Sequence, residues 1–144
     1  MNQTDERKPA AQHGEALLWA AENGYDLVVS LLLTNGDITD DFHGRAVVVA
    51  ACYGRSKALG VLLDAGTISA KHLGRAVEQA TKNGHAMLVC RLLGTGRPPD
   101  RSIRLALKDA ISRGHTETAL LLLDIIESAP PVINVLTSDI SRGG

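Results

Sequence analysis

The sequence repeats itself every 30 residues, and this periodicity limits the fold more than any other feature of the chain. Four copies lie in register along the 144 residues. Five columns are identical in all four copies: Ala16, Ala46, Ala76 and Ala106; Ala20, Ala50, Ala80 and Ala110; Gly24, Gly54, Gly84 and Gly114; and the leucine pairs at 32–33, 62–63, 92–93 and 122–123. A fixed period of this length predicts an array of stacked structural units.

Each unit has the pattern of two short helices. Small and apolar residues recur at helical spacing before the repeated glycine, as in Ala46, Val47 and Ala50. The glycine ends the first helix because it adopts a left-handed conformation at little cost. The second helix has an apolar face that contains the leucine pair. We expect first helices near 10–22, 40–52, 70–82 and 100–112, and second helices near 26–34, 56–64, 86–94 and 116–127.

The residues between these helices predict where each one starts and stops. N-cap candidates for the second helices stand two residues after the repeated glycine, at Asp26, Ser56 and Thr116. Ala86 breaks this column and predicts a weaker start for the third copy. A second set of glycines fits the ends of the second helices, at Gly36, Gly66 and Gly96. Thr39 and Ser69 are N-cap candidates for first helices, and Pro98 with Pro99 suits the start of the last one.

At this level the chain resembles the ankyrin-repeat family. The family string A-x-x-x-G-H-x-x-x-V-x-x-L-L-x-x-G is similar to "QATKNGHAMLVCRLLGTG" in the third copy, and "AAENGYDLVVSLLLTNG" and "AACYGRSKALGVLLDAG" match nearly as well. The resemblance covers about residues 10–127. It departs from the family in its period, which is usually about 33 residues, and in the absence of the T-P-L-H motif from the first helix.

The resemblance implies an all-α, slightly curved solenoid that binds other proteins through its concave face without catalysis. Its shortened units look like the degenerate ankyrin variants of bacterial effectors and large-virus proteins. We therefore expect four repeats at 10–39, 40–69, 70–99 and 100–129. Residues 1–9 are expected to be a disordered segment, and residues 130–144 a C-terminal cap or an incomplete fifth repeat.

Composition limits the compartment and the partner. The chain is 44% hydrophobic but only 3% aromatic, which suits closely stacked helices, and its net charge of −1 lacks the basic footprint that nucleic acid demands. We find neither a Sec-type signal peptide nor an apolar run long enough to span a membrane. Cys52 and Cys90 are expected to be reduced, buried thiols. We expect a cytoplasmic protein, or one in the host cytosol after non-Sec secretion if it is an effector.

No residue pattern predicts an enzyme, a cofactor or a metal site. His85 and His115 follow the repeated glycine, where a structural role is expected, and His43 and His72 lack a set of nearby ligands at metal spacing. The acidic segment "GDITDD" does not have the alternating oxygen ligands of a calcium loop. Helix capping explains its residues better.

Partner-binding residues are instead expected at variable positions of the first helices, which line the concave face in the ankyrin proteins that this chain resembles. The candidates are Trp19, Asn23, Arg45, Tyr53, Arg75, Lys82, Asn83 and Arg113. Trp19 and Tyr53 carry side chains that often dominate binding energies. The alternatives are that Trp19 packs as an N-terminal cap and that Tyr53 is merely exposed. Arg45 and Arg75 share a column, which indicates either an acidic partner or a solvated face.

The last predicted helix, "TETALLLLDIIES", has more apolar residues than one neighbour can cover. The tail beyond Pro130 folds back as a cap, begins a fifth repeat, or leaves the helix to a partner or a second copy. We expect a monomer that recognises a protein. The alternative function is an assembly module that forms a homodimer through the face of Leu121 and Ile125, and a more distant one is an accessory domain of a longer enzyme.

Overall fold

A computed structural model describes residues 9–128, and these residues form eight helices and no strand. The helices are α1 (Pro9–Asn23), α2 (Asp26–Asn35), α3 (Asp40–Cys52), α4 (Ser56–Asp64), α5 (Ala70–Lys82), α6 (Ala86–Leu93), α7 (Asp100–Arg113) and α8 (Thr116–Glu127). The predicted helices agree with these bounds within one residue at each end. Of the predicted terminal segments, 1–9 lies outside the described residues except for Pro9, which begins α1, and 130–144 lies wholly outside them.

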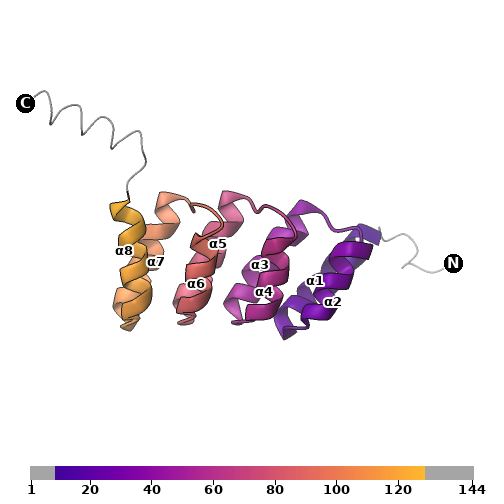
Figure 1. Ribbon diagram of the computed structural model, residues 1–144, viewed down its shortest axis with the longest axis horizontal. Coiled ribbons are helices and arrows are strands. Elements are labelled where there is room, and N and C mark those ends of the chain that lie inside the picture. The colour runs from indigo at the N-terminus through magenta and orange to yellow at the C-terminus, as the bar shows by residue number, and fades with distance from the viewer. Residues whose placement is uncertain (1–8, 129–144) are drawn as a thin grey trace, which may run out of the picture.

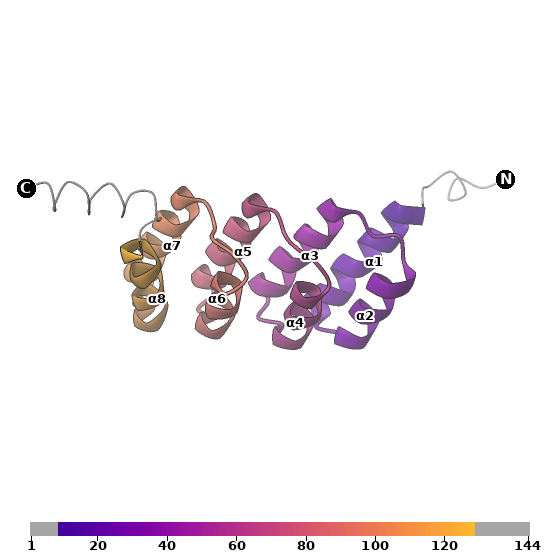
Figure 2. The same ribbon diagram turned by 45° about the horizontal axis from the view of Figure 1, so that its top comes forward.

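The helices are arranged in two layers, as Figures 1 and 2 show. The first helices of the units, α1, α3, α5 and α7, pack side by side in one layer, which we call the first-helix layer. The second helices, α2, α4, α6 and α8, form the other, and each antiparallel pair packs against the next along the chain. The expected all-α repeat architecture is therefore confirmed at this level. No helix within residues 9–128 is long and apolar enough to cross a membrane.

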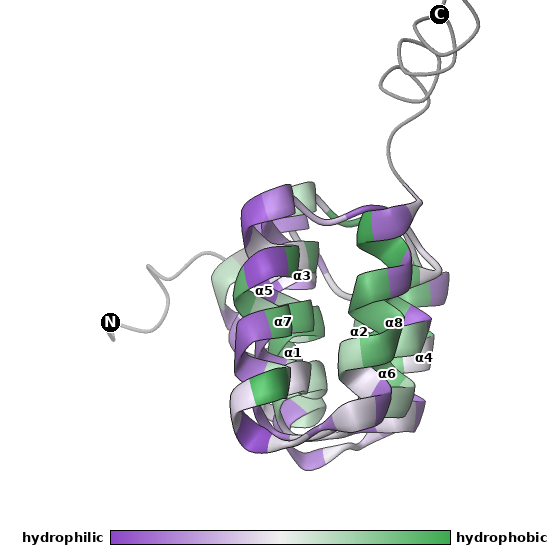
Figure 3. Ribbon diagram, turned by 90° about the vertical axis from the view of Figure 1, so that its left-hand side faces the viewer, coloured by the Kyte–Doolittle hydropathy of each residue, from purple (hydrophilic) through white to green (hydrophobic). Residues whose placement is uncertain are grey.

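The core lies between the two layers and is built from the repeated columns. Figure 3 shows the two layers side by side, with hydrophobic segments of the ribbon in green. Ala50, Ala80 and Ala110 are fully buried, as are Leu62 and Leu122. Alanine in the first helices keeps their backbones close together, while leucine from the second helices fills the space between layers. With few aromatic residues in the chain, the core depends on this regular fit of small and branched side chains.

The repeated glycines make the turn inside each unit. They are the four residues with positive φ in the described chain: Gly24, Gly54, Gly84 and Gly114, with φ between 72° and 77°. After each glycine the next N–H donates back to the carbonyl of the buried alanine column, as Arg55 does to Ala50 at 2.9 Å. This closes the C-terminal end of the first helix and confirms the predicted role of the glycine.

The predicted N-caps of the second helices are wrong by one position. Asp26, Ser56 and Thr116 are the first helical residues, and the N-cap positions belong to Tyr25, Arg55, His85 and His115, none of which caps with its side chain. The cause is the tight glycine turn. The residue directly after the glycine already occupies the N-cap position, so the second residue after it is helical. Ala86 nevertheless begins the shortest helix, of 8 residues.

The connectors between units follow the sequence prediction at one end and differ at the other. Thr39 and Ser69 are N-caps, and their side-chain oxygens accept from the N–H of Phe42 at 3.3 Å and of His72 at 3.2 Å. Pro99 precedes the first residue of α7. Of the second glycine set only Gly36 directly ends a helix; Gly66 and Gly96 lie further along, because α4 ends at Asp64 and α6 at Leu93.

A further glycine column, which the sequence analysis did not identify, sets the spacing of the first-helix layer. Gly14, Gly44 and Gly74 lie inside α1, α3 and α5, and a side chain from the next first helix covers each of them. The covering residues share a column too: Phe42, His72 and Ser102. A Cβ atom on any of these glycines would collide with its covering side chain. The fourth copy has exposed Arg104 in the glycine position, so α7 presents no such slot.

Candidate interaction surface

The structure exposes all eight residues that the sequence singled out. Trp19 and Asn23 belong to α1, Arg45 to α3, Arg75 and Lys82 to α5, and Arg113 to α7, while Tyr53 and Asn83 are the C-caps of α3 and α5. Residues spaced by four or eight along a helix share one side of it. We call the solvent side of α1, α3, α5 and α7 the first-helix face.

Two aromatic side chains stand out from this face. Trp19 is 66% exposed and Tyr53 is 51% exposed. The alternative in which Trp19 packs as part of a cap is therefore wrong. The Trp19 carbonyl accepts a hydrogen bond from the Asn23 side chain at 2.9 Å, which orders the end of α1. Exposed Trp and Tyr are the residues most often found at the energetic centre of a protein interface.

The polar candidates differ in how far they are already engaged. Asn83 donates from Nδ2 to the carbonyls of Cys52 at 3.1 Å and Gln79 at 3.0 Å, so it ties the end of α5 to α3. Arg113 pairs with Asp109 at 3.4 Å along α7. Lys82 forms no ion pair with any described residue. Asn83 thus supports the array, whereas Lys82 is available to a partner.

A hollow of about 280 Å³ lies on this face between α3 and α5. Its lining residues come from the outward sides of the two helices: Asp41, Arg45, Val48, Val49, Lys71, His72 and Arg75. We call it the α3–α5 hollow. The two valines are half-buried. Arg45 and Arg75, the stacked pair that the sequence placed in one column, both line it.

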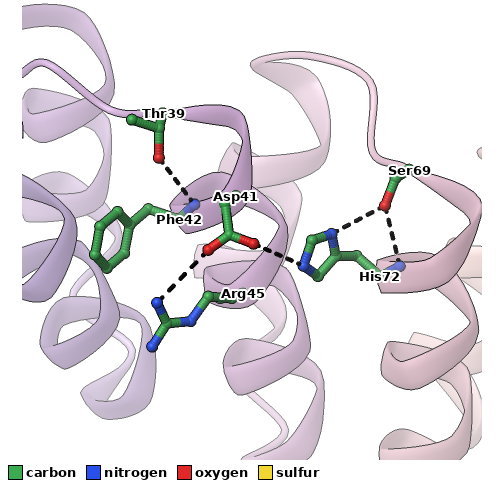
Figure 4. Close-up of polar contacts among 6 residues, drawn as sticks. All are labelled: Thr39, Asp41, Phe42, Arg45, Ser69 and His72. Carbon is green, nitrogen blue, oxygen red and sulfur yellow. Dashed lines mark hydrogen bonds and ion pairs between the residues drawn. The ribbon is translucent and has the colours of Figure 1, made fainter.

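Asp41 lies between Arg45 and His72 at this hollow, as Figure 4 shows. Its carboxylate lies 3.6 Å from the Arg45 guanidinium and 3.6 Å from His72 Nε2. His72 is held from its other side, where Nδ1 is 2.9 Å from the Ser69 hydroxyl, and Arg45 stacks 4.9 Å above the Phe42 ring. Lys71 and Arg75 form no ion pair with any described residue. The local cations are thus only partly neutralised.

Charge is unevenly distributed along the first-helix layer. α1 carries two carboxylates, Glu15 and Glu22, and no cation within residues 9–23. α5 carries three cations and one carboxylate, and α7 carries four cations and two carboxylates. The α5 and α7 cations are all exposed: Lys71, Arg75, Lys82, Arg101, Arg104, Lys108 and Arg113. The face is therefore acidic at its α1 end and basic over α5 and α7, although the whole chain is nearly neutral.

A second hollow, of about 450 Å³, lies in the other layer between α6 and α8. Its apolar residues include Met87, which is 79% exposed, and Leu120, which is 61% exposed. Leu121 and Ile125, the residues expected to form a homodimer face, are only half-buried, and Leu120 is the more exposed side chain. Cys90 also lines this hollow and is exposed, so the prediction that it is buried is wrong: its side chain borders the hollow between α6 and α8 and lies outside the core.

The histidines serve the packing of the array. His43 is buried and its Nε2 lies 2.7 Å from the carbonyl of Leu62, and His13 accepts from the N–H of Asp37 at 2.9 Å. His85 and His115 lie against Gly54 and Gly84 of the preceding units. No group of three His, Cys, Asp or Glu side chains that could hold a metal ion occurs within residues 9–128.

No protein-family model matches this chain, and no curated protein matches it.

Proposed function

We propose that this protein is an ankyrin-type solenoid that recognises another protein through its first-helix face, without catalysis. The proposal rests on one observation above the rest: Trp19 and Tyr53 project into solvent from a face that the repeat keeps regular beneath them. Burying such aromatic side chains against a partner releases water from a large apolar area. A rigid array provides that area without the entropic cost of ordering a loop.

The glycine column supports the same proposal because it fixes the spacing of the recognition surface. Gly14, Gly44 and Gly74 keep neighbouring first helices in contact. The columns of the face therefore repeat at a constant interval, and variation in side chains alone decides which partner fits. This is how stacked repeats are used for binding in general. A cytoplasmic location, or a host cytosol if the chain is an effector, belongs to the same proposal.

The proposal is tested by selecting ligands for the full chain from a displayed peptide library and measuring their affinity for variants. Trp19→Ala and Tyr53→Ala should each weaken the selected ligands by about 30-fold, the effect of losing a residue worth about 2 kcal/mol. Leu27→Ala, which truncates an exposed leucine of α2 in the other layer, is the matched control and should leave affinity unchanged. Circular dichroism establishes that every variant is folded. Ligands that lose affinity only with Leu27→Ala would refute the proposal.

A second candidate function, an assembly module, is favoured by the α6–α8 hollow. Met87 and Leu120 expose apolar surface on adjacent second helices, and a second copy of the chain could bury it. Light scattering after size exclusion tests this over a wide range of protein concentration. A dimer that dissociates with Leu120→Ser would move this function ahead, and a monomer at every concentration would remove it.

A further inference from the structure

The first-helix face is divided by charge, and the division predicts how a partner lies on it. The α1 end carries Glu15 and Glu22, while the exposed side chains of α5 and α7 are mainly cationic. Such a surface attracts a ligand whose own charges are arranged in the opposite order. The two exposed aromatic residues, Trp19 in α1 and Tyr53 at the end of α3, lie near the acidic end of the face. A partner would thus place its apolar anchor over α1 and α3, and its acidic residues over α5 and α7.

The α3–α5 hollow lies where the two halves meet, and its chemistry suits a carboxylate side chain. Lys71 and Arg75 have no ion-pair partner among residues 9–128, and both line the hollow. Val48 and Val49 give it an apolar lining against which the methylene groups of a glutamate would pack. The guanidinium group of Arg75 can hold a carboxylate through two parallel hydrogen bonds. The hollow is open to solvent from the first-helix face.

One carboxylate of the chain itself, that of Asp41, already lines the α3–α5 hollow. Asp41 lies 3.6 Å from both Arg45 and His72, and it lines the same hollow. Its contacts are long for charge-assisted hydrogen bonds, which are usually about 2.7–2.9 Å. Asp41 is exposed, and its carboxylate neutralises Arg45. The charges of Lys71 and Arg75 therefore remain available to a ligand. It also repels any second carboxylate that enters.

We propose that the basic half of the first-helix face binds an acidic segment of a protein partner, with one carboxylate in the α3–α5 hollow and with Asp41 as its internal competitor. This inference rests on the proposed function and names the chemistry of the partner. A protein segment suits the face better than nucleic acid does. Apart from Arg45, which pairs with Asp41, the cations of the face lie on α5 and α7, and carboxylates such as Glu78 and Asp109 are interspersed among them. At the α1 end, Glu22 would repel a continuous polyanion.

The test uses a short polyglutamate peptide, blocked at both ends, and amide NMR of the full chain at about 0.1 M salt, where screening confines charge effects to about 10 Å. Shifts should concentrate on α5, α7 and the hollow. Arg75→Gln and Lys71→Gln should each weaken binding about two- to fivefold, the range of one exposed ion pair. Asp41→Asn should strengthen it by a similar factor. Lys57→Gln makes the same change of charge on α4 in the other layer and should leave the Kd unchanged.

Three results would overturn the inference. One is an equal loss of affinity in Lys57→Gln and Arg75→Gln, which would mean that only net charge matters. Another is weaker binding after Asp41→Asn, which would mean that Asp41 positions the ligand instead of competing with it. The third is tighter binding of a short oligothymidylate at the same residues, which would assign the basic half to nucleic acid. A polyglutamine peptide of the same length serves as the ligand control and should cause no shifts.

The outcomes also separate this inference from the proposed function. If polyglutamate binds nowhere on α5 or α7 while Trp19→Ala still weakens the selected ligands, the acidic-segment inference fails and protein recognition stands. If polyglutamate binds at the hollow but the selected ligands are insensitive to Trp19→Ala and Tyr53→Ala, the aromatic recognition surface fails and the anion-binding chemistry stands.

Discussion

Two glycines inside helices of this chain occupy opposite environments, although the sequence alone does not distinguish them. Gly44 in α3 lies under the His72 side chain of the next first helix, whose ring is held by Ser69 and Asp41. Gly60 in α4 faces the end of the Arg91 side chain, with Nη2 2.9 Å from the site of a new Cβ. A guanidinium on a flexible chain can move aside at little cost, whereas a packed ring cannot.

These environments predict opposite signs for the same substitution. Alanine gains about 1 kcal/mol over glycine in a helix interior, and overpacking costs about 1–3 kcal/mol. Gly60→Ala should therefore stabilise the fold by up to about 1 kcal/mol, because only Arg91 has to move. Gly44→Ala should destabilise it by up to about 2 kcal/mol, because the cost of the collision with the held His72 ring outweighs the gain in propensity. Urea unfolding midpoints measure both, and a stabilised Gly44→Ala would contradict the close approach of α3 and α5.

The residues also explain which parts of the face could be predicted from the sequence. The sequence singles out Trp19 and Tyr53 because they vary at positions that a strict repeat leaves open, and Arg45 because it shares a column with Arg75. The column of Gly14, Gly44 and Gly74 was missed because Arg104 interrupts it, so it is not identical in all four copies. The role of Asp41 could not be predicted, because its partner His72 comes from a different unit, 31 residues away.

At the scale of the helices, the two kinds of helix start are built differently. First helices α3 and α5 begin with a side-chain cap, at Thr39 and Ser69. Second helices begin directly after a glycine turn, whose backbone hydrogen bonds to the preceding alanine order the chain without a side-chain cap. The sequence contains a Ser or Thr near several of both kinds of start. Local pattern alone therefore predicted helix bounds well but could not tell a working cap from a residue just inside the helix.

This difference predicts unequal effects for two similar substitutions. Thr39→Ala removes the acceptor of the Phe42 N–H and should lower the free energy of unfolding by about 1 kcal/mol. Ser56→Ala removes no cap, because Ser56 is the first residue of α4, and should change stability by less than about 0.5 kcal/mol. Chemical unfolding of the two variants provides the comparison. Equal losses would indicate that Ser56 caps α4 in solution.

At the scale of the whole molecule, the array is close to one-dimensional. Each of the two inner helix pairs packs against the pair before it and the pair after it, and the first-helix layer provides the most continuous contact along the described residues. The 30-residue period predicted this architecture because identical columns can be buried only by stacking identical units. The repeat pattern does not predict how the array is closed at its two ends. Arg104 stands in the glycine column of the fourth copy, so α7 lacks the slot that α1, α3 and α5 present to the next first helix.

A one-dimensional array should unfold from its ends, and two leucines of one column test this. Leu62 in α4 and Leu122 in α8 are both fully buried, so truncation to alanine should cost at least about 2 kcal/mol at each site. Leu122 lies in the last described pair, which has a neighbour on one side only among residues 9–128. Leu122→Ala should therefore accelerate amide exchange about 30-fold in α7 and α8 while α1 to α4 keep their protection.

Leu62→Ala should act differently because the second pair connects the first pair to the rest of the array. Loss of its packing weakens both interfaces at once, so exchange should accelerate in α1 to α4 together and, to a smaller extent, beyond them. Hydrogen exchange resolved by peptide measures both variants under the same conditions. Uniform acceleration along the chain in both would mean that the four pairs unfold as a single cooperative unit. Acceleration confined to α7 and α8 in the Leu122→Ala variant would instead establish that the first-helix face keeps its α1 to α5 surface when its last pair opens.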